Sequence, residues 1–274
     1  PSSARKKSHT VPAGTAIQKG YRWLLNDAAV YTKTDMNDTE QVKQEADNLL
    51  LSLKEANLIN DKQYTYLTGF TARCPIFYGI PKIHKNGCPL RPIVSQINGP
   101  TSSISRYVSE LLFVAEKEIP YLLQDTTAFL NIIQKEKQIS EKTFIVTMDV
   151  TSLYTNIPHE EGADWVAEYY AETLKFWPKY TPDLAPIDKE TLKKLILFIL
   201  QNTTFEFNNE FFTQNYGTTM GASFSVRFAN IYMHQFFTKF FQNANFTKPK
   251  FIARLIDDIF FTWDDSRENL DLLI

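Results

Sequence analysis

The chain has 274 residues, of which 43% are hydrophobic, and a formal net charge of −2. A chain of this length and apolar content can bury a core as one large domain or two lobes, so it is globular and not disordered. The near-neutral charge argues against indiscriminate binding to nucleic acid, because affinity for phosphate comes from Lys and Arg.

The first half of the chain predicts two amphipathic helices that flank a strand-rich region. Residues 1–37 show no clear period, whereas apolar residues in 38–56 recur at helical spacing. Short β-type runs, interrupted by Pro and Gly, occupy residues 69–100. A second helix is expected over 102–119, where Pro120 ends it. The expected caps are Asp38 for the first helix and Ser102 or Ser103 for the second.

The second half alternates strands and helices. In chain order we expect a strand over 143–149, a helix over 159–176, a Pro-rich loop over 177–186, a helix over 188–201, a β-hairpin over 203–214 turned at Asn208 and Asn209, and a helix over 223–242. The pattern predicts an α+β fold around an antiparallel sheet.

Two adjacent carboxylates, Asp257 and Asp258, lie between runs of apolar and aromatic residues in 251–263. Strand-forming residues on both sides predict a hairpin whose turn holds the acids. A third acid, Asp149, closes the strand over 143–149. Mg²⁺ typically takes one or two carboxylates together with phosphate oxygens, so these acids are a candidate metal site. An isolated Asp-Asp pair is most often a solvated turn, and the hypothesis therefore depends on the other segments.

Charge is distributed unevenly along the chain. Residues 62–109 contain six basic side chains and no Asp or Glu, whereas the rest of the chain is acidic. The stretch is a candidate nucleic-acid patch, and a solvated loop that lacks acids is the simpler alternative. The six residues are Lys62, Arg73, Lys82, Lys85, Arg91 and Arg106.

Other sequence features narrow the class of protein. The two cysteines, Cys74 and Cys88, are too few for a zinc motif or a disulfide framework, which fits a reducing compartment. No apolar run reaches the roughly 18 residues of a membrane span. The polar start also lacks the apolar core of a signal peptide. We therefore expect no membrane segment.

Four segments in a fixed order carry a resemblance to a known family. TMDVTSLYTNIP (147–158), QNYGTTMGASFSVRFANIYM (214–233) and RLIDDIFFTW (254–263) resemble the palm motifs of reverse transcriptases. Upstream, FYGIPKIHKNGCPLRPIVS (77–95) is similar to the fingers segment of Penelope-like retroelement enzymes, a family related to telomerase. An ordered set of motifs specifies a family far better than one motif alone.

The resemblance implies a right-hand polymerase fold with fingers and palm in this chain and the thumb outside it. The implied layout is an N-terminal extension with an amphipathic helix (1–61), fingers (62–98 and 159–212) and palm (99–158 and 213–274). In many relatives a GIY-YIG endonuclease follows. Because the chain begins with Pro1 and ends at Ile274 inside an amphipathic stretch, we expect a longer protein.

The implied activity is that of a nucleotidyltransferase, an RNA-directed DNA polymerase that uses two metal ions. The implied partners are an RNA template, a DNA primer and deoxynucleoside triphosphates. Mg²⁺ is the implied cofactor, with Mn²⁺ as an alternative, and the implied location is the nucleus. Asp149 and Asp257 would bridge the metals with the Val150 carbonyl as a further ligand, and Asp258 would complete the acidic site.

The resemblance also implies residues that hold the incoming nucleotide. Lys82 and Arg91 match the fingers cations that bind the triphosphate, and Lys85 is a weaker candidate. Tyr154 stands where the family carries an aromatic that blocks a ribose 2′-hydroxyl. The alternatives are exposed loop cations and an ordinary packed tyrosine.

A glycine-bracketed loop matches the segment that lies against the template base and nucleotide in the family. Gly217 and Gly221 would permit close backbone approach there. Gln214 and Met220 match as well. Where the family commonly has prolines, this chain has Ser223 and Val226, which predicts a looser loop. Leu255 likewise replaces an aromatic.

The sequence is compatible with three hypotheses about function. The first is an RNA-directed DNA polymerase, with an RNA polymerase of similar palm geometry as a variant. The second is a catalytically decayed relative that binds nucleic acid through the 62–109 stretch. The third is a structural α+β domain in which the motifs arise by chance. Metal-dependent nucleotide addition separates the first from the others.

Overall fold

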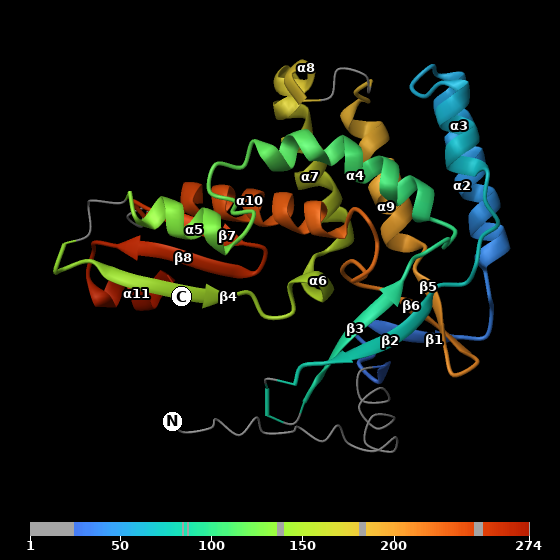
Figure 1. Cartoon of the computed structure of the whole chain (residues 1–274). Helices are drawn as coiled ribbons and strands as arrows, with labels where there is room; N and C mark the ends of the chain where they lie inside the picture. The colour runs from blue at the N-terminus through green and yellow to red at the C-terminus, as the bar shows by residue number, and fades with distance from the viewer. Residues whose placement is uncertain are drawn as a thin grey trace, which may run out of the picture.

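The computed structural model describes residues 25–83, 85–86, 88–135, 140–180, 185–243 and 249–273. A central group of helices separates a five-stranded sheet from a three-stranded sheet (Figure 1). The described strands are β1 (Tyr31–Thr34), β2 (Ile76–Pro81), β3 (Leu90–Ser95), β4 (Phe144–Asp149), β5 (Thr204–Phe207), β6 (Glu210–Gln214), β7 (Ile252–Leu255) and β8 (Asp258–Trp263).

The helices differ widely in length. The longer ones are α2 (Thr39–Glu55), α4 (Ser102–Lys117), α7 (His159–Thr173), α9 (Lys189–Gln201) and α10 (Ser225–Asn243). The shorter ones are α3 (Asp61–Thr68), α5 (Thr126–Ile133), α6 (Leu153–Asn156), α8 (Trp177–Tyr180) and α11 (Arg267–Leu273), with a 3₁₀ turn over Leu174–Phe176. Within the described ranges, no helix is both long enough and apolar enough to cross a membrane.

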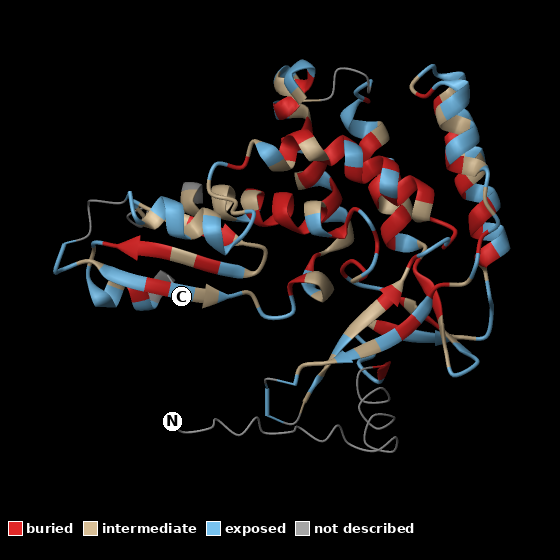
Figure 2. Ribbon diagram, viewed as in Figure 1, coloured by how far each residue is buried: buried red, intermediate tan, exposed pale blue. Residues whose placement is uncertain are grey.

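The main core lies among α4, α7, α9 and α10, where the fully buried residues gather (Figure 2). α4 provides the centre, because Val108, Leu111, Leu112 and Ala115 on one of its faces are all completely buried. α4 is therefore amphipathic, as the sequence predicts. The helices therefore form the rigid body to which both sheets attach.

The five-stranded sheet has the order β1-β6-β5-β2-β3. Its pairs are antiparallel except for β2 with β5. The sheet joins β2 and β3 to the β5–β6 hairpin across more than 100 residues of chain. Its small core is aromatic: Phe77 stacks on Phe205, which stacks on Phe212.

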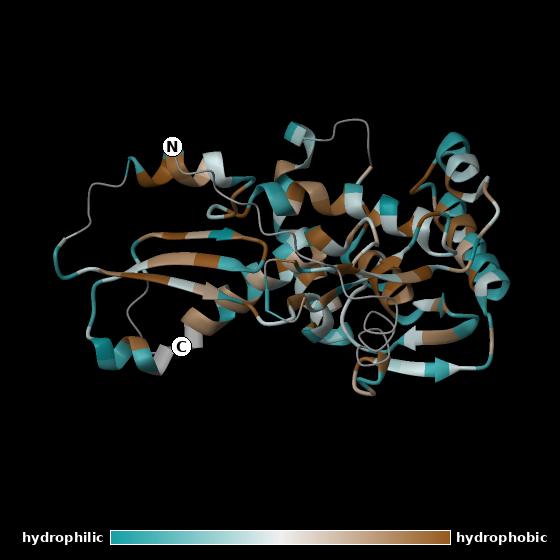
Figure 3. Cartoon of the chain, turned by 60° about the horizontal axis from the view of Figure 1, so that its bottom comes forward, coloured by the Kyte–Doolittle hydropathy of each residue, from teal (hydrophilic) through white to brown (hydrophobic). Residues whose placement is uncertain are grey.

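The three-stranded sheet has the order β4-β8-β7 and is entirely antiparallel. One of its faces buries Val146, Ile259, Phe261 and Trp263, with Leu270 of α11 packed against them. On the opposite face Phe129 of α5 contacts the ring of Phe260. Figure 3 shows α5 on one side of this sheet and α11 on the other.

Several sequence predictions about local structure are confirmed. α2, α7, α9 and α10 lie where periodicity places them. The β5–β6 hairpin turns at Asn208 and Asn209, whose φ angles of 52° and 61° fit a type I′ turn. The predicted α+β class is correct.

Other predictions about local structure are wrong in detail. The N-cap of α4 is Thr101 and not Ser102 or Ser103. Asp38 holds the predicted N-cap position of α2, but its side chain makes no capping hydrogen bond, and its carboxylate accepts one from Thr204 Oγ1 at 2.8 Å. The predicted loop over 177–186 begins with the short helix α8.

Some elements escape the sequence reading because they are short. β1 lies in the region without a period, where only its first residue, Tyr31, is buried. α3 carries a signal that could have revealed it: Asn60 and Gln63 form a reciprocal capping box. α5 begins after Asp125, which caps the amide of Ala128 at 2.7 Å.

Two adjacent leucines of α2 test the packing of this helix. Leu50 is fully buried, so Leu50→Ala should lower the free energy of unfolding by about 2–5 kcal/mol. Leu51 is 38% exposed, so Leu51→Ala should change it by less than about 1 kcal/mol. Urea unfolding of both variants measures the difference, and equal losses would contradict the placement of α2.

Candidate active site

The three candidate acids meet at one end of the three-stranded sheet. β4 ends at Asp149, β8 begins at Asp258, and the two residues are direct cross-strand partners. Opposed residues of an antiparallel pair point to the same face, which here is the face away from the buried aromatic layer. Only Asp257 lies in the hairpin turn, because Asp258 already belongs to β8.

A backbone hydrogen bond joins the two acid-bearing segments. Val150 N donates to Asp257 O at 3.1 Å, so the residue after Asp149 is tied to the turn. Asp149 and Asp258 are exposed, and Asp257 is half-buried. The three carboxylates therefore lie on an accessible edge of the fold.

The acids repel one another. Loss of hydration and then the negative charges of Asp257 and Asp149 raise the pKa of Asp258 above its ordinary value. A cation bound at this edge would relieve that repulsion. The electrostatics and the oxygen donors both fit a hard divalent metal.

The acids do not form a closed cage. Among the described residues, no three His, Cys, Asp or Glu side chains are grouped so as to hold a metal ion by themselves. Mg²⁺ is usually bound through one or two carboxylates together with water and phosphate oxygens. The residues present therefore fit an open site that is completed by a substrate.

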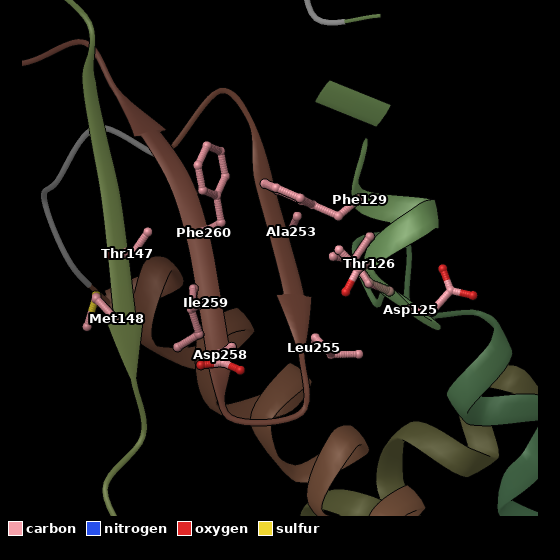
Figure 4. A pocket seen from close by; sticks show the side chains of 11 residues that line it. Asp125, Thr126, Phe129, Thr147, Met148, Ala253, Leu255, Asp258, Ile259 and Phe260 are labelled. Atoms are coloured by element: carbon pink, nitrogen blue, oxygen red, sulfur yellow. The ribbon is translucent and has the colours of Figure 1, made fainter. Parts of the chain in front are cut away.

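An apolar pocket of about 260 Å³ adjoins the acids, between α5 and the open face of the sheet. In Figure 4, Asp258 and Leu255 lie at its lower end, with Thr126 and Phe129 of α5 across from the strands. Leu255, which replaces an aromatic of the family, is thus a lining residue of this pocket.

The predicted fingers cations lie on the β2–β3 hairpin. Arg91 is exposed and pairs across the strands with Ile80, while Lys82 follows the end of β2 and its amide donates to Pro89 O at 2.9 Å. Lys85 is exposed in the connecting turn. Within the part of the chain that the structure describes, none of the three cations forms an ion pair.

Tyr154 lies between these cations and the acids. Burial and the negative charge of Asp257 raise the pKa of the Tyr154 phenol, and the positive charge of Arg91 opposes that rise. Both charges therefore act on the same side chain. The structure brings Arg91, Tyr154 and Asp257 into one region, as the sequence predicts.

The loop that contains Gly217 and Gly221 makes its close approaches to the protein's own backbone. A Cβ on Gly217, which has φ +72°, would lie 2.1 Å from Tyr154 O. A Cβ on Gly221 would lie 2.1 Å from Val94 O. Only glycine fits at either place, so the loop packs tightly between α6 and β3.

Hydrogen bonds hold both ends of this loop. Thr218 N donates to Tyr154 O at 2.7 Å, and Val94 N donates to Met220 O at 3.1 Å. Gln214 is buried, and its Nε2 donates to Tyr216 O at 2.8 Å. The backbone of Met220 and the side chain of Gln214 therefore support the loop.

Hydrogen bonds surround the positions where the family commonly has prolines. Ser225 Oγ, which is buried, donates to Thr219 O at 2.8 Å, and Ser109 Oγ donates to Ser223 O at 3.2 Å. Val226 is 44% exposed on the first turn of α10. The looser loop expected at Ser223 and Val226 stays a prediction.

Two residues near the site escape the sequence reading. His159 Nε2 donates to Gly217 O at 2.8 Å, and burial lowers the pKa of this histidine. Arg254 is completely buried three residues before Asp257. A basic residue inside the apolar run of a predicted strand was the available signal for Arg254, because a lone buried charge requires a partner.

Comparisons with known proteins bear on both fold and family. The chain is similar to solved structures of telomerases, with TM-scores just above 0.5. The apo telomerase of Candida tropicalis is 13% identical with a TM-score of 0.52, over 89% of this chain and 47% of that chain. The telomerase of Candida albicans, in complex with a TWJ fragment of telomeric RNA, is 14% identical with a TM-score of 0.51, over 97% and 52%.

These likenesses show a shared palm and fingers fold, and the chain spans about half the length of those telomerases. No curated protein matches it in sequence. A family model described as "Reverse transcriptase (RNA-dependent DNA polymerase)" matches residues 83–274, which include all three acids and the glycine loop. The chain therefore belongs to the reverse transcriptase family.

Proposed function

We propose that this chain is the palm and fingers core of an RNA-directed DNA polymerase, which adds deoxynucleotides to the 3′-hydroxyl of a primer. One observation carries the proposal: the β4–β8 pairing sets Asp149 opposite Asp258, with Asp257 in the adjoining turn. Three carboxylates at an open strand end suit phosphoryl transfer, whose transition state concentrates negative charge.

The acids are proposed to hold Mg²⁺, or Mn²⁺ in its place, with the Val150 carbonyl as a further ligand. Such ions, when bound, neutralise charge on the attacking and leaving oxygens. Side chains of the protein would bind the incoming nucleotide. Arg91 and Lys82, with Lys85 nearby, would bind the triphosphate, since Arg presents a planar fork to phosphate oxygens.

Tyr154 is proposed to exclude a ribose 2′-hydroxyl by its bulk. Its backbone is fixed from one side by the Thr218 amide and by the close approach of Gly217. A backbone held in this way limits how far Tyr154 can move from an added hydroxyl. The glycine loop would therefore act on sugar selection through Tyr154.

We further propose that the enzyme is Penelope-like, with a nuclear location and with 62–98 and 159–212 as fingers around the palm segments 99–158 and 213–274. Two features support this reading. The segment that resembles Penelope-like fingers forms the β2–β3 hairpin, and strands from both proposed fingers segments share one sheet.

The alternative of a decayed nucleic-acid-binding relative gains no support from the basic stretch. Lys62 on α3 and Arg106 on α4 lie with the helices, and Arg106 Nη1 donates to Tyr66 of α3. The β2–β3 hairpin lies well away from α3 (Figure 1). Five of the six cations, all except Arg73, are thus divided between the helices and the hairpin.

The decisive experiment is primer extension on an RNA template with deoxynucleotides and Mg²⁺. Asp257→Ala should reduce incorporation at least about 100-fold, because a metal ligand contributes several kcal/mol and each 1.36 kcal/mol is tenfold in rate. Asp271→Ala, which changes an exposed acid of α11, is the matched control and should keep full activity. Incorporation that survives Asp257→Ala would refute the proposed site.

The raised pKa of Asp258 predicts a pH-dependent stability. Its ionised form is disfavoured in the folded protein, so Asp258→Asn should raise the Tm at pH 7. The gain in Tm should decrease as the pH falls through the raised pKa, and it should vanish below the unfolded pKa of about 3.9, where Asp258 is protonated in both states. Calorimetry from pH 4 to pH 8 measures the gain.

Mg²⁺ should reduce the difference in Tm between Asp258→Asn and the wild type, because it should raise the Tm of the wild type more. A gain in Tm that is the same at every pH, and insensitive to Mg²⁺, would contradict charge repulsion at this edge.

Sugar selection gives a separate test of Tyr154. Tyr154→Ala should weaken discrimination against ribonucleotides by about 10–200-fold, the range expected for steric selection in a pocket. Tyr154→Phe keeps the ring and should keep the discrimination. The ratio of kcat/KM for deoxy- and ribonucleotides measures the effect, and an unchanged ratio in Tyr154→Ala would remove Tyr154 from this role.

A further inference from the structure

Arg254 is 0% exposed, and among the residues that the structure describes no carboxylate forms an ion pair with it. Its guanidinium donates to neutral oxygens: Nη2 to Asn230 O at 2.7 Å, and Nη1 to Asn230 Oδ1 at 3.1 Å and to Ile256 O at 2.8 Å. Within the described ranges, Nε has no hydrogen-bond partner.

Such an arrangement is costly, because a buried charge normally needs an opposite charge beside it. Burial lowers the pKa of Arg254 to about 10. The ring of Tyr121 lies 6.0 Å from the guanidinium carbon and offers a weak cation–π contact. Replacing a buried charge by an apolar residue is often neutral or stabilising, so packing alone does not account for Arg254, and its role lies with the oxygens that it binds.

The turn between β7 and β8 has a conformation that needs such support. Leu255 pairs with Asp258, which leaves Ile256 and Asp257 as a two-residue loop. Ile256 has φ +56°, a value that a β-branched residue adopts only when its surroundings impose it. Short hairpin turns of this kind favour glycine at the first position.

Two contacts impose that conformation on Ile256. Its side chain packs against the helical core, and its carbonyl accepts the hydrogen bond from Arg254. The next residue is Asp257, whose carbonyl accepts from Val150 N. The guanidinium therefore binds the carbonyl of the residue just before Asp257, a proposed metal ligand. Two hydrogen bonds, one to Ile256 O and one from Val150 N to Asp257 O, connect it to the segment that contains Asp149.

The other end of the contact reaches the rigid core. Asn230 belongs to α10, and its Nδ2 donates to Glu116 Oε1 of α4 at 2.8 Å. Glu116 also accepts from Arg227 at 3.1 Å. Arg254 therefore connects α10, which is itself hydrogen-bonded to α4, with the turn that contains Asp257. A planar fork with several donors can bridge two such partners at once, whereas an ammonium cannot do so with the same geometry.

We infer that Arg254 is a positioning residue, which fixes the Ile256 carbonyl and thereby sets Asp257 in register with Asp149. The inference rests on the proposed function only for its kinetic consequence. The effect on the turn itself is structural and can be measured without any activity.

Hydrogen exchange of the Val150 amide is the primary test, on the whole chain. Arg254→Met removes the donors but keeps an apolar side chain of similar length, and it should speed exchange at Val150 at least tenfold. Amides of α7 and α9 should keep their wild-type rates. Arg254→Lys should give an intermediate rate, and it carries the test if Arg254→Met fails to fold.

Arg227→Met is the matched control. Arg227 is a partly buried arginine of the same network, bonded to Ser109 and Glu116 but not to the turn. This variant should leave exchange at Val150 unchanged relative to the rest of the core. Equal acceleration of every core amide in Arg254→Met would overturn the inference, because it would show a merely structural role.

Kinetics supply the second readout. In primer extension, Arg254→Met should lower kcat at least tenfold with little change in the KM for deoxynucleotide, because binding of the triphosphate is assigned to the hairpin cations. If the wild type incorporates no nucleotide, the proposed function fails and the exchange rates still decide the role of Arg254. Normal exchange at Val150 together with normal kcat would refute it.

Discussion

The register between β4 and β8 is the constraint on which the candidate site depends. One face of this pair buries Val146 of β4 and Phe261 and Trp263 of β8. A slip of one residue in either strand would turn the buried side chains of that strand to solvent. It would also send the acid of that strand, Asp149 or Asp258, into the apolar layer, where an ionised carboxylate is strongly disfavoured. Burial on one face of the sheet therefore aligns the acids on the other.

The helical core extends this constraint to the rest of the site. α10 packs against α4 and α7, and its first turn follows directly from the glycine loop. Its side chain Asn230 contacts Arg254, which lies beneath the acid-bearing turn. Parts of the site that are distant in the chain thus share one support. A change in the position of α10 would therefore displace both the glycine loop and the acid-bearing turn.

The sequence predicts the parts that depend on local pattern. Alternation in 143–149 and the apolar runs on either side of Asp257 were enough to place a strand and a hairpin. The motif order predicts that the acids, the cations and Tyr154 lie together. The β4–β8 pairing places the acids at one strand end, and the charges of Arg91 and Asp257 both act on Tyr154. The catalytic and binding roles of these residues stay predictions.

Contacts between segments that are distant in the chain could not be predicted from the sequence. No local signal shows that Asp38 bonds with Thr204 in place of capping α2, or that Gly217 and Gly221 face protein backbone. The hydrogen bond from Ser225 to Thr219 likewise depends on how the loop folds back. β1 is recognisable only through its partner β6, because its own pattern is too short.

The glycine loop also limits how the molecule can move. It is bonded at one end to Tyr154 and at the other to Val94 of β3, and both contacts are too close to admit a side chain. If the β2–β3 hairpin swung relative to α6, one of these bonds would stretch or break, at a net cost of about 1 kcal/mol each. The hairpin with its cations and the tyrosine are therefore mechanically linked, so that a displacement of one is transmitted to the other.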